Sequence, residues 1–249
     1  MIYSILMEMY GEHLIVKYRI RSLSDIVKKY IKDQILSAQL KSGEKIVESD
    51  IAEALEISRA PVREALHSLS ENGMITFSPR RGHYVNEMQR EELFEVFQIR
   101  ISLEFEILKI LVSEHLLEDS DYIQIIKLSD EMEDIDNKAE DESERIFLLN
   151  SLDIKFHRYL WRKSGCLKRA GMLEDLFFQL LIAMNKNIIS LGNCKEKAEE
   201  HKLLINALQT NDAKLVCDEF YHHLDKYIVA TLGDLTESEK KIMQVVFGI

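Results

Sequence analysis

Hydrophobic residues recur at three- and four-residue intervals along most of the chain, which is the pattern of amphipathic helices. Near the N-terminus this spacing predicts a helix over residues 23–38, a second helix capped by Ser49, and a third helix that begins at Ser58. Six further helices are predicted after Asn86, over residues 91–117, 122–136, 142–163, 167–191, 195–209 and 212–232. Because no proline and few glycines interrupt them, an antiparallel all-helical bundle is the natural architecture for this part.

The helix at Ser58 has a first turn that suits DNA. Ser58 is a good N-cap residue, and Pro61 falls where a missing N–H costs nothing. Arg59 and Arg63 are four residues apart and therefore share one face, while Ala60 keeps the turn slim. A thin, basic helix N-terminus fits into the major groove of DNA, and an arginine there can donate two hydrogen bonds to one guanine.

The neighbouring segments complete a DNA-binding unit. The helix capped by Ser49 is joined to the next helix by a short turn, as in a helix-turn-helix. After a stop at Gly73, residues 74–77 and 83–85 read as two short strands around a basic tip, Arg80-Arg81. The sequence therefore predicts a winged helix-turn-helix. A helical domain with incidental arginines would not explain why cap, arginine pair and wing follow in order.

These residues resemble the winged-helix domain of the GntR family of bacterial transcription regulators. The resemblance is ungapped over residues 22–86 and is carried by Leu40 to Glu44, Ile51 to Leu55, Ser58 to Leu66, Leu69, Asn72-Gly73 and Arg81-Gly82. Ser42 departs from the family's usual proline at that position. Together with the helix and wing, the resemblance implies binding to double-stranded operator DNA. The expected contacts are Ser58, Arg59, Ala60, Arg63, Arg80, Arg81 and Gly82.

Composition divides the chain into two parts with different charge. The chain has 249 residues, 46% of them hydrophobic, and a formal net charge of −11, which is unusual for a DNA-binding protein. Residues 21–88 hold ten Lys and Arg against ten Asp and Glu, whereas residues 89–249 hold twenty against thirty-one. We therefore expect an N-terminal extension at residues 1–20, a DNA-binding domain at 21–88, and an acidic helical domain at 89–249 for effector binding and dimerisation. Attraction to phosphate should be local to the arginines.

The cysteines and apolar runs indicate the compartment. Cys166, Cys194 and Cys217 are widely spaced and form no metal-binding repeat, which suits a reducing cytoplasm. No apolar run reaches the roughly 18–20 residues that span a bilayer. The apolar start, Met1 to Leu6, is too short for a secretory signal and lacks a basic beginning.

Four residues of the second part have the chemistry of a metal site. Asp153 and His157 are four residues apart and lie on one helix face, while His201 and His223 come from two later helices. One carboxylate and three imidazoles could hold a first-row divalent metal, with Zn or Ni favoured by the nitrogen ligands. Taken singly, however, each histidine is more often a satisfied polar residue than a ligand.

The surrounding motifs resemble the FCD ligand-binding domain of the FadR subgroup of GntR regulators. They are Asp153-x-x-Phe156-His157, Glu200-His201 followed by Ala207, and His223-Leu224, and the resemblance covers about residues 90–232. It implies that Asp153, His157, His201 and His223 are the metal ligands. The adjacent His222 would point about 100° away around the helix and is expected at the surface.

Two further residues are candidates for effector binding. Arg100 enters an otherwise apolar helix, and its permanent charge requires a carboxylate partner. That partner is either Glu104, four residues on, or the carboxylate of a small organic acid bound at the open metal. Asn150 is one turn from Asp153 and could also face the cavity.

These features favour a metabolite-responsive transcription regulator that works as a homodimer on a near-palindromic operator. The family resemblance implies repression relieved by the ligand as the commoner behaviour, with activation as the alternative. One alternative is a hydrolytic zinc enzyme, because three histidines and a carboxylate also describe such a centre. No additional acid is evidently placed as a base, however, and an enzyme would leave the winged helix unexplained. A second alternative is a structural metal in a domain that only dimerises.

Overall fold

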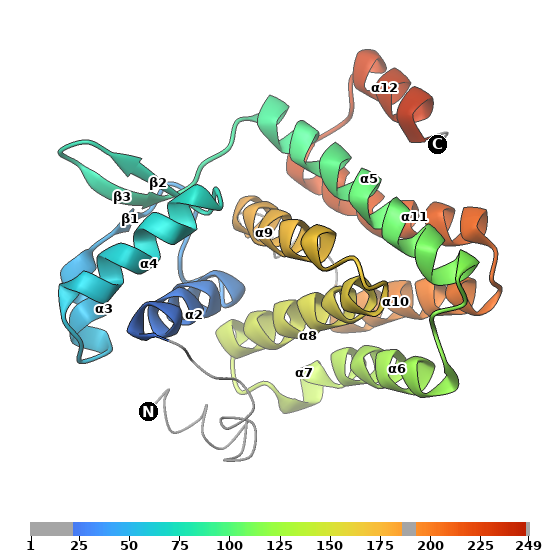
Figure 1. The fold of residues 1–249 in the computed structure, drawn as a ribbon, viewed down its shortest axis with the longest axis horizontal. Helices are drawn as coiled ribbons and strands as arrows, with labels where there is room; N and C mark the ends of the chain where they lie inside the picture. The colour runs from blue at the N-terminus through green and yellow to red at the C-terminus, as the bar shows by residue number, and fades with distance from the viewer. Residues whose placement is uncertain (1–21, 186–192, 248–249) are drawn as a thin grey trace.

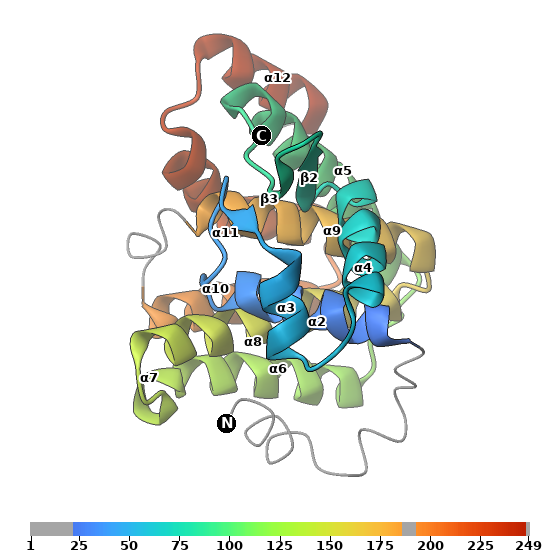
Figure 2. The ribbon, with the colours of Figure 1, turned by 90° about the vertical axis from the view of Figure 1, so that its left-hand side faces the viewer.

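The structure is a computed structural model that describes residues 22–185 and 193–247. Residues 1–20 and the end of the helix predicted over 167–191 lie outside the described residues. Figures 1 and 2 show a small unit of three helices and a β-hairpin packed against one side of a larger group of helices. The fold is therefore mainly α-helical, with a winged helix-turn-helix followed by a helical domain, as predicted.

The winged helix extends from α2 to β3. Its elements are α2 (Leu23–Leu36), β1 (Lys45–Ile46), α3 (Glu48–Ala54), α4 (Arg59–Glu71), β2 (Ile75–Ser78) and β3 (Gly82–Val85). The three strands are antiparallel in the order β1-β3-β2, with Ser78 opposite Gly82 at the end of the hairpin. The strand β1 was not predicted, because two residues are too few to show an alternating pattern.

In the winged helix, α2 and α4 begin where the sequence predicted, and α3 does not. Ser22 caps α2, because its hydroxyl accepts the N–H of Asp25. Ser58 is the N-cap residue of α4, although its hydroxyl makes no capping hydrogen bond. The prediction that Ser49 caps the next helix is wrong. The N-cap residue of α3 is Val47, two residues earlier, so the helix begins at Glu48 and the Ser49 hydroxyl bonds the neighbouring Asp50 carboxylate instead.

The helical domain extends from α5 to α12. Its elements are α5 (Arg90–Ser113), α6 (Asp119–Glu133), α7 (Ile135–Lys138), α8 (Glu142–Lys163), α9 (Leu167–Met184), α10 (Cys194–Gln209), α11 (Ala213–Leu232) and α12 (Glu237–Phe247). Helix α10 packs along α6, and α11 packs along α5. The core of the domain contains the fully buried side chains of Phe156, Trp161 and Phe220.

The winged helix is held by α8 and α9 through the ends of its own helices. Asn150 on α8 donates to the Leu36 carbonyl at 2.9 Å, and Asn185 donates to the Ile35 carbonyl at 2.7 Å. Carbonyls in the last turn of a helix lack the usual partner four residues on. Asn150 satisfies the Leu36 carbonyl, and Asn185 is a second donor to the Ile35 carbonyl, which also accepts the Ala38 N–H. Gln179 on α9 similarly donates to a carbonyl at the end of α4, at 2.9 Å. The two parts are therefore joined by specific hydrogen bonds as well as by the chain.

The start of α5 is fixed to the end of α11. Arg90 donates through Nε to the Leu232 carbonyl at 3.1 Å and forms an ion pair with Glu239 on α12. This arginine follows directly on the segment that leaves the wing, so the junction between the two parts is anchored in the helical domain. Over the two described ranges, every helix is too short or too polar to cross a membrane.

Candidate metal centre and DNA-reading surface

Three helices of the helical domain bring four buried side chains together. Asp153 and His157 come from α8, His201 from α10 and His223 from α11. One ligand atom from each lies within 4.8 Å of all the others. Nε2 of His201 is 3.0 Å from Oδ1 of Asp153, and Nε2 of His157 is 3.2 Å from Nε2 of His223. His222 is exposed, as expected from its position on the helix.

The outward-facing ring nitrogens of these histidines face oxygen atoms at different distances. Nδ1 of His201 lies 2.7 Å from the Lys197 carbonyl, and Nδ1 of His223 lies 3.4 Å from a Glu200 carboxylate oxygen. Nδ1 of His157 points at Glu104 over a longer distance, 3.9 Å. Only the His201 contact is a hydrogen bond, and it places the proton of that ring on Nδ1 and directs the Nε2 lone pair inward. Nδ1 of His157 and Nδ1 of His223 are buried without a hydrogen-bond partner among the described residues.

Two of the inner atoms are acceptors that oppose each other, whereas Nε2 of His157 and Nε2 of His223 lie within hydrogen-bonding distance of each other. The buried Asp153 Oδ1 and His201 Nε2 have no hydrogen-bond donor between them, although they are only 3.0 Å apart. Buried acceptors of this kind are costly unless a cation or a proton lies between them. One carboxylate oxygen and three imidazole nitrogens are the ligands that zinc and nickel prefer, so the residues fit a divalent transition metal.

Burial sets the protonation of the cluster. It lowers the pKa of His157 and of His223 well below the ordinary value, and the neighbouring positive groups lower it further. Burial alone would raise the pKa of Asp153, but Lys197 and the nearby histidines outweigh it and hold that pKa well below the ordinary value. A neutral imidazole and an ionised carboxylate are the forms that bind a metal.

A small cavity lies beside the ligands and is lined by two cations. Its volume is about 20 Å³, which is enough for an ordered water or an ion. Arg100, Lys197, Asp153 and His223 all contribute to its wall. The buried Lys197 ammonium lies 3.1 Å from Oδ2 of Asp153 and 4.8 Å from the ring centroid of Tyr227. Sequence reasoning missed Lys197, although it precedes His201 by one helical turn on the same face.

The two candidate effector residues lie in different places. Arg100 lines the cavity and also pairs with Glu104, whose Oε1 is 3.2 Å from its Nε. The indole of Trp161 donates to the other Glu104 oxygen at 2.7 Å, so the acid is held from both sides. Asn150 does not reach the cavity, because its side chain is directed to the Leu36 carbonyl at the winged helix.

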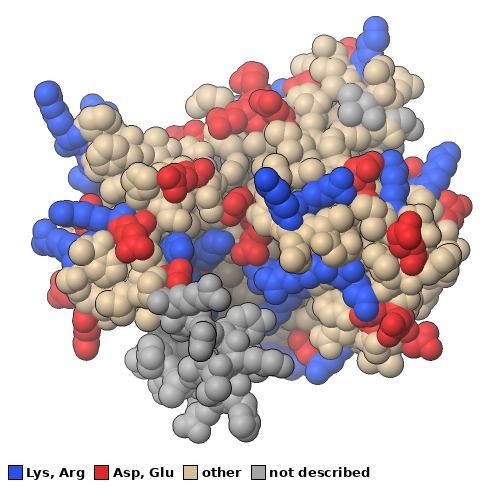
Figure 3. Space-filling model, viewed as in Figure 1, with Lys and Arg blue, Asp and Glu red and all other residues tan. Residues whose placement is uncertain are grey.

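The first turn of α4 presents its basic side chains to solvent. Arg59 and Ala60 are exposed, and 65% of the Arg63 side chain is accessible. Nε of Arg63 lies 2.7 Å from Glu48 on α3, which orients the guanidinium across the helix-turn-helix. Ser58 is exposed, and its hydroxyl makes no capping bond. Figure 3 shows basic side chains projecting from this end of the molecule, with acidic ones among them.

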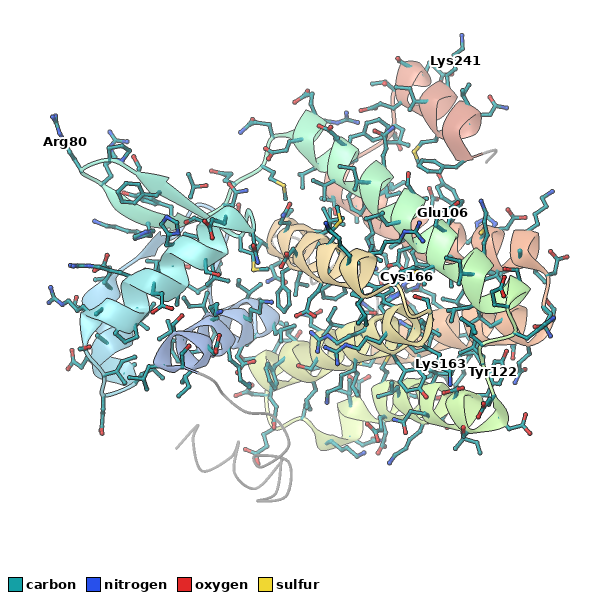
Figure 4. The ribbon with its side chains drawn as sticks, viewed as in Figure 1. Arg80, Glu106, Tyr122, Lys163, Cys166 and Lys241 are labelled. Atoms are coloured by element: carbon teal, nitrogen blue, oxygen red, sulfur yellow. The ribbon has the colours of Figure 1, made fainter. Side chains whose placement is uncertain are left out.

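The wing is a tight hairpin with arginines at its tip. Arg80 adopts a positive φ of 66°, and Gly82 has a φ of 97°, a conformation that favours glycine. The Arg81 N–H donates to the Ser78 carbonyl at 3.0 Å and closes the turn. Arg80 and Arg81 are both exposed, and Figure 4 shows Arg80 extending outward from the end of the hairpin.

Comparisons with known proteins match both parts of the chain. Residues 23–85 match the family described as bacterial regulatory proteins, gntR family, and residues 95–226 match the FCD domain. The chain is 27% identical over 207 residues to a probable D-xylose utilization operon transcriptional repressor of Paenarthrobacter nicotinovorans, covering 82% of this chain and 87% of that protein. It is also 27% identical to the gluconate operon transcriptional repressor of Bacillus subtilis, covering 78% and 79%.

A solved structure has the same fold. McbR/YncC of E. coli superposes with a TM-score of 0.74 at 22% identity, covering 84% of this chain and 97% of that one. The FCD match alone spans more than half of the chain, and the relatives are transcription regulators, not enzymes. The chain therefore belongs to the GntR family of bacterial transcription regulators, and it is a DNA-binding regulator with an FCD ligand-binding domain.

Proposed function

We propose that this protein is a repressor whose operator binding is controlled by a small organic acid held at a metal centre in the helical domain. The observation that carries the proposal is the convergence of three buried imidazole nitrogens and one buried carboxylate oxygen beside a cavity lined by Arg100. Two of these atoms, Oδ1 of Asp153 and Nε2 of His201, have no hydrogen-bond partner among the described residues. The names of the two relatives, both operon repressors, support repression.

The metal proposed for this site is Zn²⁺ or Ni²⁺, because nitrogen dominates the ligand set. Asp153, His157, His201 and His223 would hold it, and the ion would supply an electrophilic centre for a carboxylate of the effector. Arg100, already paired with Glu104, would contribute a second positive contact. A metal held by these four residues with a coordination position left open would give the acid somewhere to bind.

The metal proposal is tested by metal analysis of protein purified without a histidine tag. Wild-type protein should contain one divalent ion per subunit, and His201→Ala should lose it together with thermal stability. His222→Ala is the matched control, because that histidine is exposed beside a ligand and should keep the metal. Equal metal content and equal stability in wild type and His201→Ala would remove the site, while leaving the DNA-binding function untouched.

The proposed DNA contacts are Ser58, Arg59, Ala60 and Arg63 on α4, and Arg80, Arg81 and Gly82 on the wing. A homodimer would place two α4 helices in successive major grooves of a near-palindromic operator. Replacing Arg59 and Arg63 with alanine should abolish specific binding, because one good bidentate base contact is worth about 1–3 kcal/mol. Arg162→Ala, an exposed arginine on α8, should leave affinity unchanged. Wild-type affinity of the double variant in an anisotropy titration would contradict the assignment.

The effector proposal makes a separate prediction. Small organic acids should change the operator affinity of metal-loaded protein and leave His201→Ala unaffected. If no acid changes the affinity of a metal-loaded protein that binds its operator normally, the metal is structural and the domain serves only to assemble the dimer.

A further inference from the structure

The charged groups buried around the four ligands balance one another without a metal. Two of them are positive, Arg100 and Lys197, and two are negative, Glu104 and Asp153. They form two close pairs, with nitrogen–oxygen distances of 3.2 Å for Arg100 and Glu104 and 3.1 Å for Lys197 and Asp153. The metal-free cluster is therefore neutral as long as its histidines are neutral.

The state of each charge supports this balance. The Lys197 ammonium lies 3.1 Å from Oδ2 of Asp153 and 4.8 Å from the ring centroid of Tyr227, so a carboxylate and an aromatic face both stabilise its charge. Glu104 is held between Arg100, whose Nε is 3.2 Å from Oε1, and the Trp161 indole, which donates to Oε2 at 2.7 Å. If Glu104 retained a proton, the cluster would be more positive, not less. At the edge of the cluster, Glu200 and Lys226 form a further pair and cancel.

A divalent ion at the four ligands changes this balance. It adds two positive charges to a neutral, buried cluster, and an unpaired charge in the protein interior is strongly unfavourable. If residue 197 were uncharged, Asp153 would offset half of the ion's charge, and one carboxylate of an effector would complete the neutralisation. With Lys197 already paired to Asp153, two negative charges have to come from the ligand.

We propose that Lys197 is a specificity-determining residue that selects effectors with two negative charges, such as small dicarboxylic acids, over monocarboxylic acids. The inference rests on the proposed function, since it concerns the same site. Lys197 and Arg100 line one cavity together with Asp153 and His223, so both carboxylates of such an acid have a positive partner within reach. Because the cavity is only about 20 Å³, the flexible side chains of Lys197 and Met184 have to move when an acid enters.

The first experiment measures metal affinity without any acid, by competition with a chelating dye for Zn²⁺. Lys197→Met keeps an unbranched side chain of similar length and removes the charge, so it should bind Zn²⁺ at least tenfold more tightly than wild type. Lys202→Met is the control, because this lysine lies on the same helix but pairs with Asp130 and Glu133 at the surface. Unchanged or weaker Zn²⁺ affinity of Lys197→Met would overturn the inference.

The second experiment compares acids of matched size on the Zn²⁺-loaded protein by calorimetry. The pairs are succinate with butyrate, malate with 2-hydroxybutyrate, and glutarate with pentanoate, in which a carboxylate replaces a methyl group. In wild type and Lys202→Met, the better dicarboxylate should bind at least tenfold more tightly than its partner. In Lys197→Met this preference should fall to threefold or less.

The outcomes separate the two proposals. Binding of monocarboxylates as tight as that of dicarboxylates, with the same ratio in Lys197→Met, would overturn the role of Lys197 and leave an acid-controlled regulator in place. Absence of binding of all six acids to a Zn²⁺-loaded protein would count against both the proposed effector class and the charge argument. Failure to bind Zn²⁺ at all would overturn the proposed metal centre itself.

Discussion

Removal of the Asp153 carboxylate should destabilise the protein even when no metal is bound. In Asp153→Ala the ammonium of Lys197 loses the carboxylate that lies 3.1 Å away, while it remains buried against the Tyr227 ring. Breaking a buried ion pair by deleting one partner costs about 3–5 kcal/mol, mostly because the other charge is left unpaired. In a chain of this size, that corresponds to a fall in melting temperature of roughly 6–20 °C.

The measurement is thermal unfolding by circular dichroism in excess chelator, at one protein concentration because assembly of the proposed homodimer would make stability depend on concentration. Combining Asp153→Ala with Lys197→Met removes both charges, so the double variant should recover most of the stability that the single variant lacks. Metal content should not recover, since the carboxylate ligand is still missing. An Asp153→Ala protein as stable as wild type in chelator, or a double variant no more stable than the single one, would refute the buried-pair argument.

Three other features of the molecule can be tested in the same way. Burial lowers the pKa of His157 and His223 below 6.5, so below that pH the unfolded chain takes up protons that the folded chain does not. The stability of the metal-free protein should therefore fall as pH drops below about 6.5, by up to about 1.4 kcal/mol per pH unit for each histidine. A melting temperature that stays constant from pH 6.5 to 5 would contradict this. Asn150→Ala leaves a buried carbonyl at the end of α2 without its donor, so it should lower stability by about 1–3 kcal/mol with no loss of metal; metal loss measured beside the melting curve would instead assign Asn150 to the metal site. Replacing Arg80 and Arg81 with alanine should weaken binding to all DNA sequences. It should also reduce the slope of log affinity against log salt concentration by about 0.9 for each phosphate that the wing no longer neutralises. An unchanged slope would show that the wing does not contact the DNA backbone.

The sequence predicted those elements that have a repeated pattern. The long helices of the second part appear close to their predicted ranges, because apolar spacing over several turns is an unambiguous signal. The short strand β1 and the single turn α7 have too few residues to produce a pattern. Helix α12 also was not predicted, although Met243 is buried on one side of it.

The site was predictable in part. The spacing of Asp153 and His157 placed both on one face of α8, but only the family resemblance joined them to the histidines of α10 and α11. Lys197 could have been found one turn before His201, yet a lysine in the first turn of a helix is usually at the surface. Asn150 lies one turn before Asp153, and spacing alone does not show that it turns toward α2 instead of the cavity.

The hydrogen bonds between the two parts have a consequence for engineering. Regulators of this architecture can be made into hybrid sensors, in which the winged helix of one protein is fused to the helical domain of another at the loop before α5. Here such a fusion would separate Asn150, Gln179 and Asn185 from the helix ends that they satisfy. A hybrid joined only at that loop should therefore bind DNA without responding to its ligand. Transplanting these three amides with their facing helix ends should restore the response.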